Sequence, residues 1–462
     1  MSANVSVNIK MYRVKELGDC FLLRFQNGNA KSHVLIDCGS FRNGQKSINR
    51  IKRIAKNIQQ QLKGAKLDVV VGTHQHNDHL SGFVHARDTF KSIGPEQVWL
   101  SWLDNPEDKQ AVKIGTDFNN YLTNLHLIGK EMTHQDFINA TAKDTVDEML
   151  GFFGIEKPIR ASAKEKLPPL IPAQAREILM ELGKKPPEYL SPGKILDLPG
   201  IAEGVVKVYV LGPPKKEELL YDKDPDKDET YDPHLELNSI NAGKLLYAMQ
   251  KFSGSVKEKD DKEPFPFNEP YRNSPNYKFP EKSYYNEKNK WRQIDLDWLN
   301  QAEQLALFLD SYTNNSSLVL AFQLVKTNKI LLFAADAQTG NWNSWKEIKW
   351  ENAPEGFNWL DLMKNTVLYK VGHHCSHNAT LVEGLKNMTH EELVAMIPVD
   401  VSDPNIKKKN GWKMPATNLF AELKKKTRNR IIRMDEGVQP SGEWGEFKPK
   451  TTDLYIEYEV RG

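Results

Sequence analysis

The sequence of 462 residues contains only three cysteines, at positions 20, 38 and 375. So few thiols exclude a disulfide framework, and they predict a reduced, cytoplasmic protein. No apolar run reaches the roughly 18 residues that a membrane helix needs, and no basic N-terminal region precedes an apolar stretch. The sequence therefore predicts neither a membrane span nor a secretory signal, and we expect no membrane partner.

Charge of one sign is also scarce, because 63 lysines and arginines nearly balance 61 aspartates and glutamates. The net charge of +2 argues against a protein built mainly to coat nucleic acid, although local basic patches remain open. Hydrophobic residues make up 39% of the chain, which is enough for a sizeable core. The length allows two or three average domains, or one α/β domain with insertions.

Histidine, in contrast, is concentrated at one place. His74-Gln75-His76-Asn77-Asp78-His79 follows an apolar, β-branched run at residues 67–73. A strand that ends in this pattern places three imidazoles and a carboxylate in a loop, where they can converge on one or two divalent ions. These ligands suit zinc, manganese or iron, and they exclude calcium. The alternative is a chance cluster of histidines in a polar loop, which the preceding strand and the interposed Asp78 disfavour.

Alternating strand and helix patterns surround this motif. They predict strands at residues 6–14, 20–25, 34–37 and 97–102, and helices at 48–62 and 82–90. Further strands are expected at 205–211, 317–325, 330–334, 366–371 and 454–460. The alternation predicts an α/β fold of the αβ/βα sandwich type, in which two sheets pack face to face with helices outside.

Two segments depart from the alternation. Residues 105–195 carry helical periodicity with proline-rich breaks, and they predict a helical insertion that either caps the active site or elaborates the packing. Residues 215–290 are charged, aromatic and rich in proline, and they predict a long loop insertion of low apolar content. Aromatics and lysines interleaved there could stack bases, although a loop pinned to the surface by its rings is commoner. The sandwich domain is then divided among residues 1–104, 196–214 and 291–462.

The segment from Thr73 to His79 resembles the signature of the metallo-β-lactamase fold superfamily. Three further segments agree with it in chain order: Ile36-Asp37-Cys38-Gly39, the strand that ends in Asp336, and Val371-Gly372-His373-His374-Cys375-Ser376-His377. Gly18-Asp19-Cys20, Asn314-Asn315-Ser316-Ser317 and the pair of late histidines are similar to the branch that includes the hydrolase domain of ComEC competence proteins. The membrane channel that accompanies that domain has no counterpart here, so a role in DNA uptake is not expected.

The resemblance implies a site for two divalent ions, zinc or manganese. His74 and His76 would hold the first ion, Asp78 and His79 would hold the second, and Asp336 would bridge them. One residue of the pair His373-His374 would join the second ion, because neighbouring side chains of a strand point to opposite sides. The sequence leaves open which of the two it is. The other could donate a proton or contact substrate.

One ligand of the family pattern has no counterpart. A third histidine for the first ion should follow the strand at 205–211, where Gly212-Pro213 stands instead. The weak substitutes are His126, His134, His234 and Asp104. We therefore expect the first ion to be held weakly, completed by water or bound only together with substrate. Cys375 stands where relatives commonly place glycine, and we expect it not to touch the metal.

The remaining residues receive roles from their places in the motifs. Asp78 would orient or deprotonate the nucleophilic water as well as bind metal, and Asp37 would fix the metal-binding loop. Ser376 and Asn378 would bind substrate oxygens, and His377 is the candidate proton donor to the leaving group.

The expected function is metal-dependent hydrolysis of phosphodiesters, as in a nuclease, with nucleic acid or a small phosphodiester as the partner. Hydrolysis of a small molecule such as a lactone, thioester, amide or cyclic nucleotide is the second possibility. The third is a non-catalytic scaffold in which the metal is structural. The fold hosts all of these activities, so fold alone does not choose among them.

Overall fold

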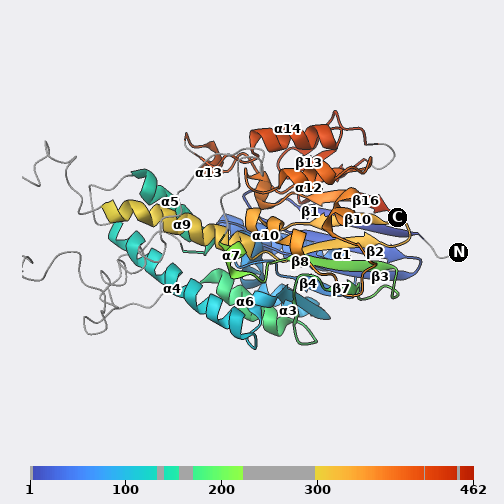
Figure 1. Ribbon diagram of the computed structural model, residues 1–462, viewed down its shortest axis with the longest axis horizontal. Helices are drawn as coiled ribbons and strands as arrows, with labels where there is room; N and C mark the ends of the chain where they lie inside the picture. The colour runs from blue at the N-terminus through green and yellow to red at the C-terminus, as the bar shows by residue number, and fades with distance from the viewer. Residues whose placement is uncertain (1–3, 133–139, 156–169, 222–296, 410, 445–447) are drawn as a thin grey trace, which may run out of the picture.

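Two eight-stranded sheets form the centre of the protein (Figure 1). The structure is a computed structural model that describes residues 4–132, 140–155, 170–221, 297–409, 411–444 and 448–462. The first sheet has the strand order β15-β16-β1-β2-β3-β4-β5-β6, and the second has the order β14-β13-β12-β11-β10-β9-β8-β7. Each sheet therefore comes mainly from one half of the chain, while the C-terminal strand β16 returns to pair with β1.

The strands of the first sheet are β1 (Val5–Tyr12), β2 (Phe21–Asn27), β3 (Ala30–Ile36), β4 (Val69–Val71), β5 (Gln97–Ser101), β6 (Glu188–Leu190), β15 (Lys450–Thr451) and β16 (Tyr455–Arg461). Those of the second are β7 (Ile195–Asp197), β8 (Val206–Gly212), β9 (Val319–Leu324), β10 (Lys329–Phe333), β11 (Thr366–Lys370), β12 (Val394–Ile397), β13 (Ile431–Arg433) and β14 (Gly437–Val438). The pairing is parallel from β3 to β6 and from β10 to β13. The predicted hairpin of β9 and β10 is antiparallel.

Apolar side chains fill the space between the sheets. The ring of Phe21 lies 5.6 Å from that of Phe333, and the ring of Phe25 lies 5.4 Å from that of Phe322. The three valines of β4 are completely buried, as expected for a parallel strand that is covered on both faces. Each buried side chain of this size contributes about 1.5–3 kcal/mol, so the strands that carry the site rest on a rigid core.

Helices cover the outer faces of both sheets (Figure 1). On the first sheet these are α1 (Gln45–Leu62), α2 (Asn77–His85), α3 (Arg87–Ile93) and α6 (Ile171–Leu182). On the second they are α10 (Thr339–Ser344), α11 (Trp359–Lys364), α12 (Val382–Asn387) and α14 (Thr417–Lys426). In α1 the predicted apolar face of Ile51, Ile54, Ile58 and Leu62 is buried. The order helix, sheet, sheet, helix confirms the predicted αβ/βα sandwich.

Three further helices, α4 (Lys109–Met132), α5 (Ala140–Phe152) and α9 (Asp297–Asn315), pack together at one end of the molecule, on the left in Figure 1. The first two belong to the segment predicted as a helical insertion, which also contains the edge strand β6. The short helix α7 (Glu217–Leu220) begins the predicted loop insertion. Most of that insertion, with the aromatics proposed to stack bases, lies outside the described residues.

Two local predictions were wrong. The helix expected at 82–90 is two helices, and because α2 already begins at Asn77, Asp78 and His79 lie in a helical turn rather than in a loop. The sequence reasoning also missed β12 and β13, whose runs of four and three residues are too short for a periodicity to be read.

Short helical turns complete the described chain: α13 (Pro404–Lys407) and the 3-10 turns Trp102–Asp104, Trp345–Glu347 and His373–Cys375. Within the ranges that the structure describes, no helix combines the length and the apolar character needed to cross a membrane.

Candidate metal centre

Four parallel strands deliver polar residues to one edge of the sandwich. Asp37 follows β3 and His74 follows β4 in the first sheet. Asp336 follows β10 and His374 follows β11 in the second sheet. The carboxyl ends of parallel strands meet at the same edge of a sheet, where binding sites of α/β proteins are found.

The early motif turns sharply after β4. His74 lies in the loop, His76 immediately precedes α2, and Asp78 and His79 occupy the first turn of that helix. Atom Nε2 of His74 lies 3.2 Å from Nδ1 of His76, so the two rings offer one nitrogen each to a common point. The positive end of the helix dipole at the start of α2 favours the ionised form of Asp78.

Asp78, His79, Asp336 and His374 form one buried cluster, in which each residue offers a ligand atom within 4.8 Å of the others. Nε2 of His79 lies 3.1 Å from Oδ2 of Asp336. Nε2 of His374 lies 2.9 Å from Oδ2 of Asp78 and 3.4 Å from Oδ2 of Asp336. The structure thus brings together residues from both sheets that are far apart in sequence.

The donor atoms of this cluster fit divalent metal ions. Oδ1 of Asp78 is buried and has no hydrogen-bond partner among the described residues, whereas buried Nε2 of His79 has only ion-pair contacts with Asp336 and Asp78. Buried polar atoms without a partner are rare in folded proteins and indicate a missing one. Imidazole nitrogen and carboxylate oxygen are the ligands that zinc and manganese take, so the buried histidines and aspartates could hold such ions.

Asp37 lies outside this cluster and holds the loop and the histidine that form part of it. Its carboxylate accepts hydrogen bonds from the Thr73 backbone N–H at 2.9 Å and the Thr73 hydroxyl at 2.7 Å. Its Oδ2 also lies 2.8 Å from Nδ1 of His79. Because Nδ1 is held on this side, Nε2 of His79 faces the cluster, as is common for histidine ligands of metals.

The loop after β3 packs directly against α2, and two glycines make this approach possible. A Cβ atom on Gly39 would lie 2.3 Å from the backbone carbonyl carbon of Asp78, and one on Gly82 would lie 2.4 Å from the carbonyl oxygen of Cys38. The backbone N–H of Cys38 donates to the carbonyl of His79 at 2.9 Å. The first turn of α2 is therefore anchored to the first sheet on its buried side.

Lys370, the last residue of β11, is a site residue that the sequence reasoning missed. Its side chain is 1% exposed, and Nζ lies 2.5 Å from Oδ2 of Asp19 and 3.2 Å from Oδ1 of Asp336. It also donates to the carbonyl of Ala335 at 2.6 Å. Lys370 thereby holds one oxygen of Asp336 and leaves Oδ2 facing His79 and His374. A lone lysine within an apolar strand was the signal that could have revealed it.

The protonation of the cluster reflects its crowded charges. Burial lowers the pKa of His79 and His374, but the nearby carboxylates of Asp336 and Asp78 outweigh this effect, and both pKa values are raised. Burial raises the pKa of Asp336, but His79, His374 and Lys370 outweigh it, and that pKa lies well below its usual value. In the metal-free protein His79 and His374 therefore keep their protons to a higher pH than usual, and a cation would have to displace them.

The structure separates His374 from His373. Only His374 belongs to the four-residue cluster, and its Nδ1 lies 2.7 Å from the carbonyl of Pro398. His373 contacts the hydroxyl of Ser376 at 2.9 Å and the amide of Gln338 at 3.0 Å. Burial is the main cause that lowers the pKa of His373 to about 4.

The argument from strand alternation was wrong, because β11 ends before the two histidines. His373, His374 and Cys375 form a turn with φ values of 37°, 50° and 66°. This left-handed backbone would suit glycine at the position of Cys375. Cys375 is buried, and it belongs to neither group of ligand atoms found in the described chain.

The rest of the late loop lies beside His373 rather than in the cluster. The Ser376 hydroxyl donates to Oδ1 of Asn378 at 2.9 Å. His377 is half-buried. These contacts therefore connect Ser376 and Asn378 with His373.

Strand β8 supplies no third histidine for the first metal position. At Gly212 a Cβ atom would already lie 2.3 Å from Oδ1 of Asn341, so the position holds no side chain at all. Of the substitutes expected, His126 lies in α4 outside both groups of ligand atoms found in the described chain. The carboxylate of Asp104 is bound by Gln75 at 2.9 Å and by Arg176 at 2.8 Å. His134 and His234 lie outside the described residues.

Asp310 of α9 approaches this side of the site, and the sequence reasoning missed it. Its Oδ1 lies 3.9 Å from Nε2 of His76. Burial raises its pKa to about 8, with further contributions from Asp78 and Asp336. The signal in the sequence was a polar pair, Asp310 and Asn314, spaced by one turn and following the apolar run at residues 305–309.

Aromatic side chains enclose the first histidines. The rings of Phe152 and Phe153, at the end of α5, lie 5.1 and 5.2 Å from the ring of His76. Trp412 stacks on Phe152 at 5.3 Å. The helical insertion therefore contributes a wall to the site.

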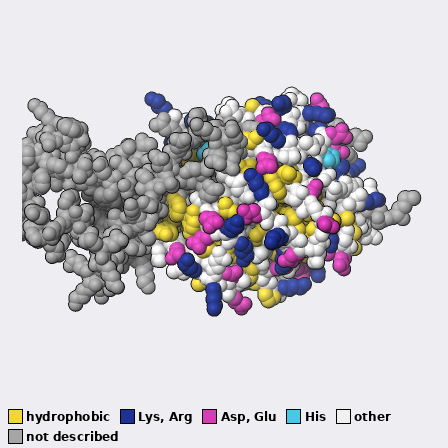
Figure 2. All heavy atoms as spheres, in the orientation of Figure 1, with side chains coloured by type: hydrophobic (Ala, Val, Ile, Leu, Met, Phe, Trp, Pro, Cys, Tyr) yellow, Lys and Arg dark blue, Asp and Glu magenta, His cyan; other side chains and the backbone are white. Residues whose placement is uncertain are grey.

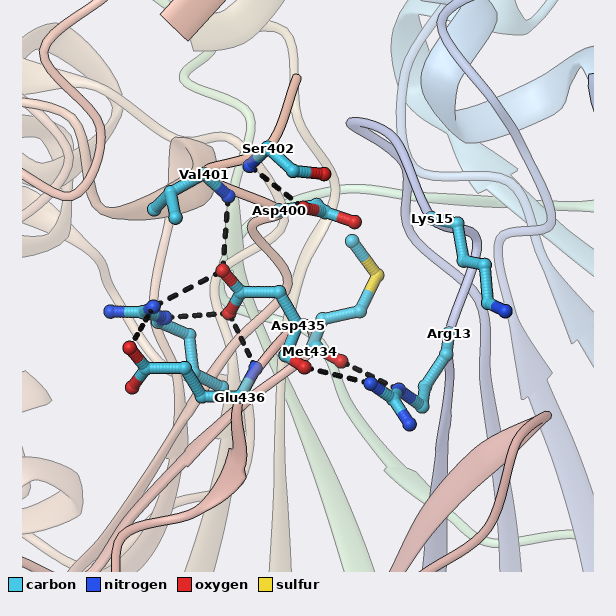
Figure 3. A pocket seen from close by; sticks show the side chains of 9 residues that line it. Arg13, Lys15, Asp400, Val401, Ser402, Met434, Asp435 and Glu436 are labelled. Carbon is cyan, nitrogen blue, oxygen red and sulfur yellow. Dashed lines mark hydrogen bonds and ion pairs between the residues drawn. The ribbon is translucent and has the colours of Figure 1, made fainter. Parts of the chain in front are cut away.

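A surface pocket of about 320 Å³ lies apart from these residues (Figure 3). Its lining consists of Arg13, Lys15, Asp400, Val401, Ser402, Arg433, Met434, Asp435 and Glu436. Arg13 donates to the backbone carbonyls of Met434 and Asp435, and Arg433 pairs with Asp435 and Glu436. Because these charges are already paired, we assign the pocket no role in the chemistry.

The protein is an αβ/βα sandwich whose buried histidines and aspartates could hold metal ions. Residues 14–161 match the family model of the metallo-beta-lactamase superfamily, whose members are mostly hydrolases. The match covers Asp37 and the whole early motif and ends before Asp336 and His374, which the structure brings to the same cluster. No curated protein matches the chain. The superfamily domain and the cluster together indicate a metal-dependent hydrolase.

Proposed function

We propose that the protein is a metal-dependent hydrolase of phosphodiester bonds, with nucleic acid as the first substrate class to test. The observation that carries this proposal is the buried cluster of Asp78, His79, Asp336 and His374, beside which His74 and His76 offer two nitrogens 3.2 Å apart. Divalent ions bound there would supply an activated water and polarise a phosphoryl oxygen. The resemblance of the motifs to those of ComEC hydrolase domains favours a phosphodiester substrate.

Asp78 is the residue best placed to act on the nucleophile. Its Oδ2 lies 2.9 Å from Nε2 of His374, which fixes the carboxylate. Its Oδ1 has no hydrogen-bond partner in the described part of the chain, so it can accept a proton from water. The rings of Phe152 and Phe153 exclude bulk water from the neighbouring His76.

The late loop would act on the substrate. We assign His377 the transfer of a proton to the leaving oxygen, and Ser376 and Asn378 the binding of substrate oxygens. Replacing His377 with alanine should then slow turnover at unchanged metal content. Turnover equal to that of the unmodified protein would remove His377 from the mechanism.

A small-molecule substrate is the second candidate, and the enclosure of the site favours it. His74, His76, Asp78, His79, Asp336 and His374 are at most 3% exposed. On the face shown in Figure 2, lysine and arginine are scattered among aspartate and glutamate without a basic patch. A lactone, thioester, amide or cyclic nucleotide would need no such patch, whereas nucleic-acid binding should weaken steeply with salt.

The deciding experiment is cleavage of end-labelled single- and double-stranded DNA and RNA by protein loaded with manganese or zinc. Asp78→Asn tests the site, and Asp197→Asn, which alters a surface ion pair with Lys207, is the matched control. Cleavage that is lost only in Asp78→Asn supports the proposal. Intact strands from protein that retains its metal refute a nuclease and favour the small-molecule hydrolase.

A further inference from the structure

Two buried polar atoms without hydrogen-bond partners among the described residues lie on the side of His76 that points away from the first metal position. Nε2 of His76 and Oδ1 of Asp310 lie 3.9 Å apart, and neither makes a hydrogen bond within the described chain. His76 is 1% exposed and Asp310 is 8% exposed. Leaving a buried donor or acceptor unsatisfied destabilises the folded protein, so a pair of such atoms in one place indicates a function.

The other nitrogen of His76 faces the metal position. An ion bonded to two imidazole nitrogens at about 2.0–2.1 Å in a tetrahedral site holds them about 3.3 Å apart. The separation of 3.2 Å between Nε2 of His74 and Nδ1 of His76 agrees with this value. Nδ1 of His74 lies on the opposite side, 3.1 Å from the hydroxyl of Thr73 and 3.3 Å from that of Ser317.

If Nδ1 of His76 binds an ion, its ring carries the proton on Nε2, and this N–H requires an acceptor. Among the described residues Asp310 alone presents a carboxylate within 4.0 Å of that nitrogen. Its second oxygen, Oδ2, accepts a hydrogen bond from Asn314 at 3.0 Å, one turn further along α9. Asp310 is thus fixed on a helix beside His76, and the gap of 3.9 Å must close to about 2.7–3.2 Å for a hydrogen bond to form.

We propose that Asp310 is a positioning residue of the first metal site: it accepts the Nε2 proton of His76 and thereby turns Nδ1 toward the ion. In this arrangement a carboxylate from α9 strengthens a two-histidine site for which β8 supplies no ligand. Carboxylate partners of this kind change metal affinity by about 10- to 100-fold. The inference rests on the proposed metal site and does not depend on the substrate.

The test is cobalt(II) binding to the metal-free protein, followed by isothermal titration calorimetry and by the visible absorption of bound cobalt. Asp310→Ala should weaken one of two sites by about 10- to 100-fold and alter its spectrum. Asp310→Asn should restore most of the affinity, because the amide oxygen still accepts a hydrogen bond. Thr313→Val, which removes a hydroxyl bonded within the same helix, should change neither. In a His76→Ala background, Asp310→Ala should cause no further loss.

Unchanged affinity of both sites in a correctly folded Asp310→Ala variant overturns the inference and leaves the proposed function intact. Equal losses in Asp310→Ala and Asp310→Asn also overturn it, because they indicate direct coordination by the carboxylate. Failure of the unmodified protein to bind an ion through His74 and His76 removes the basis of both proposals. Circular dichroism of each variant separates these results from misfolding.

Discussion

Replacing Lys370 with methionine should destabilise the metal-free protein by about 3–5 kcal/mol. The ammonium group contacts three acceptors: Asp19 at 2.5 Å, Ala335 at 2.6 Å and Asp336 at 3.2 Å. Methionine has a similar length but no charge, so two carboxylates and one carbonyl would lose their shared partner. Because Asp19 and Asp336 are 2% and 1% exposed, water cannot replace the lost contacts.

The measurement is urea-induced unfolding followed by far-ultraviolet circular dichroism in the presence of a chelator. Lys207→Met is the matched control, since Nζ of Lys207 lies 2.9 Å from Asp197 but both side chains are about one third exposed. An exposed ion pair of this kind contributes about 0–1 kcal/mol. The double variant Asp19→Asn/Lys370→Met should recover part of the loss, because one of the two uncompensated charges is gone. A loss in Lys370→Met no larger than in Lys207→Met would refute the reasoning.

Two further predictions concern metal binding. His374→Ala should lower the metal content by about one ion per chain, since it removes the nitrogen beside Asp78 and Asp336. His373→Ala should leave the metal content unchanged. Mass spectrometry of the dialysed variants measures both, and equal losses would contradict the assignment. Metal affinity should increase with pH, because the raised pKa values of His79 and His374 mean that protons must leave before a cation binds. Calorimetry in buffers of different ionisation enthalpy measures this release, and heats independent of the buffer would contradict it.

Motifs that follow one strand could be predicted from the sequence, because local pattern sets both the strand and the direction in which its loop leaves. The early motif after β4 and Asp336 after β10 are of this kind, and so is the sandwich that joins them. The choice between His373 and His374 could not be predicted in this way. It depends on three consecutive residues in left-handed conformation, which a rule for extended strands cannot describe.

Contacts between distant segments escaped the sequence reasoning for another reason. Lys370 acquires a role only because β11 ends where the residues before β2 pass, so that Asp19 and Asp336 meet around its ammonium group. Asp310 lies on α9, which follows the long insertion in the sequence. In neither case does spacing along the chain predict the contact. The contact depends on how the two sheets and α9 pack together.

The buried charges of the site tie the fold to its chemistry. Asp19, Asp37, Asp78 and Asp336 bring four carboxylates together, and among the described residues Lys370 is the one lysine or arginine that forms an ion pair with any of them. In the metal-free protein these carboxylates raise the pKa of His79 and His374, so both imidazoles keep their protons to a higher pH than usual. Divalent cations can replace those protons and satisfy Nε2 of His79 and Oδ1 of Asp78 as well. A purely structural zinc would need only a closed tetrahedral set of four ligands. This site offers two histidines more than such a set needs, so its composition favours catalysis over a structural role.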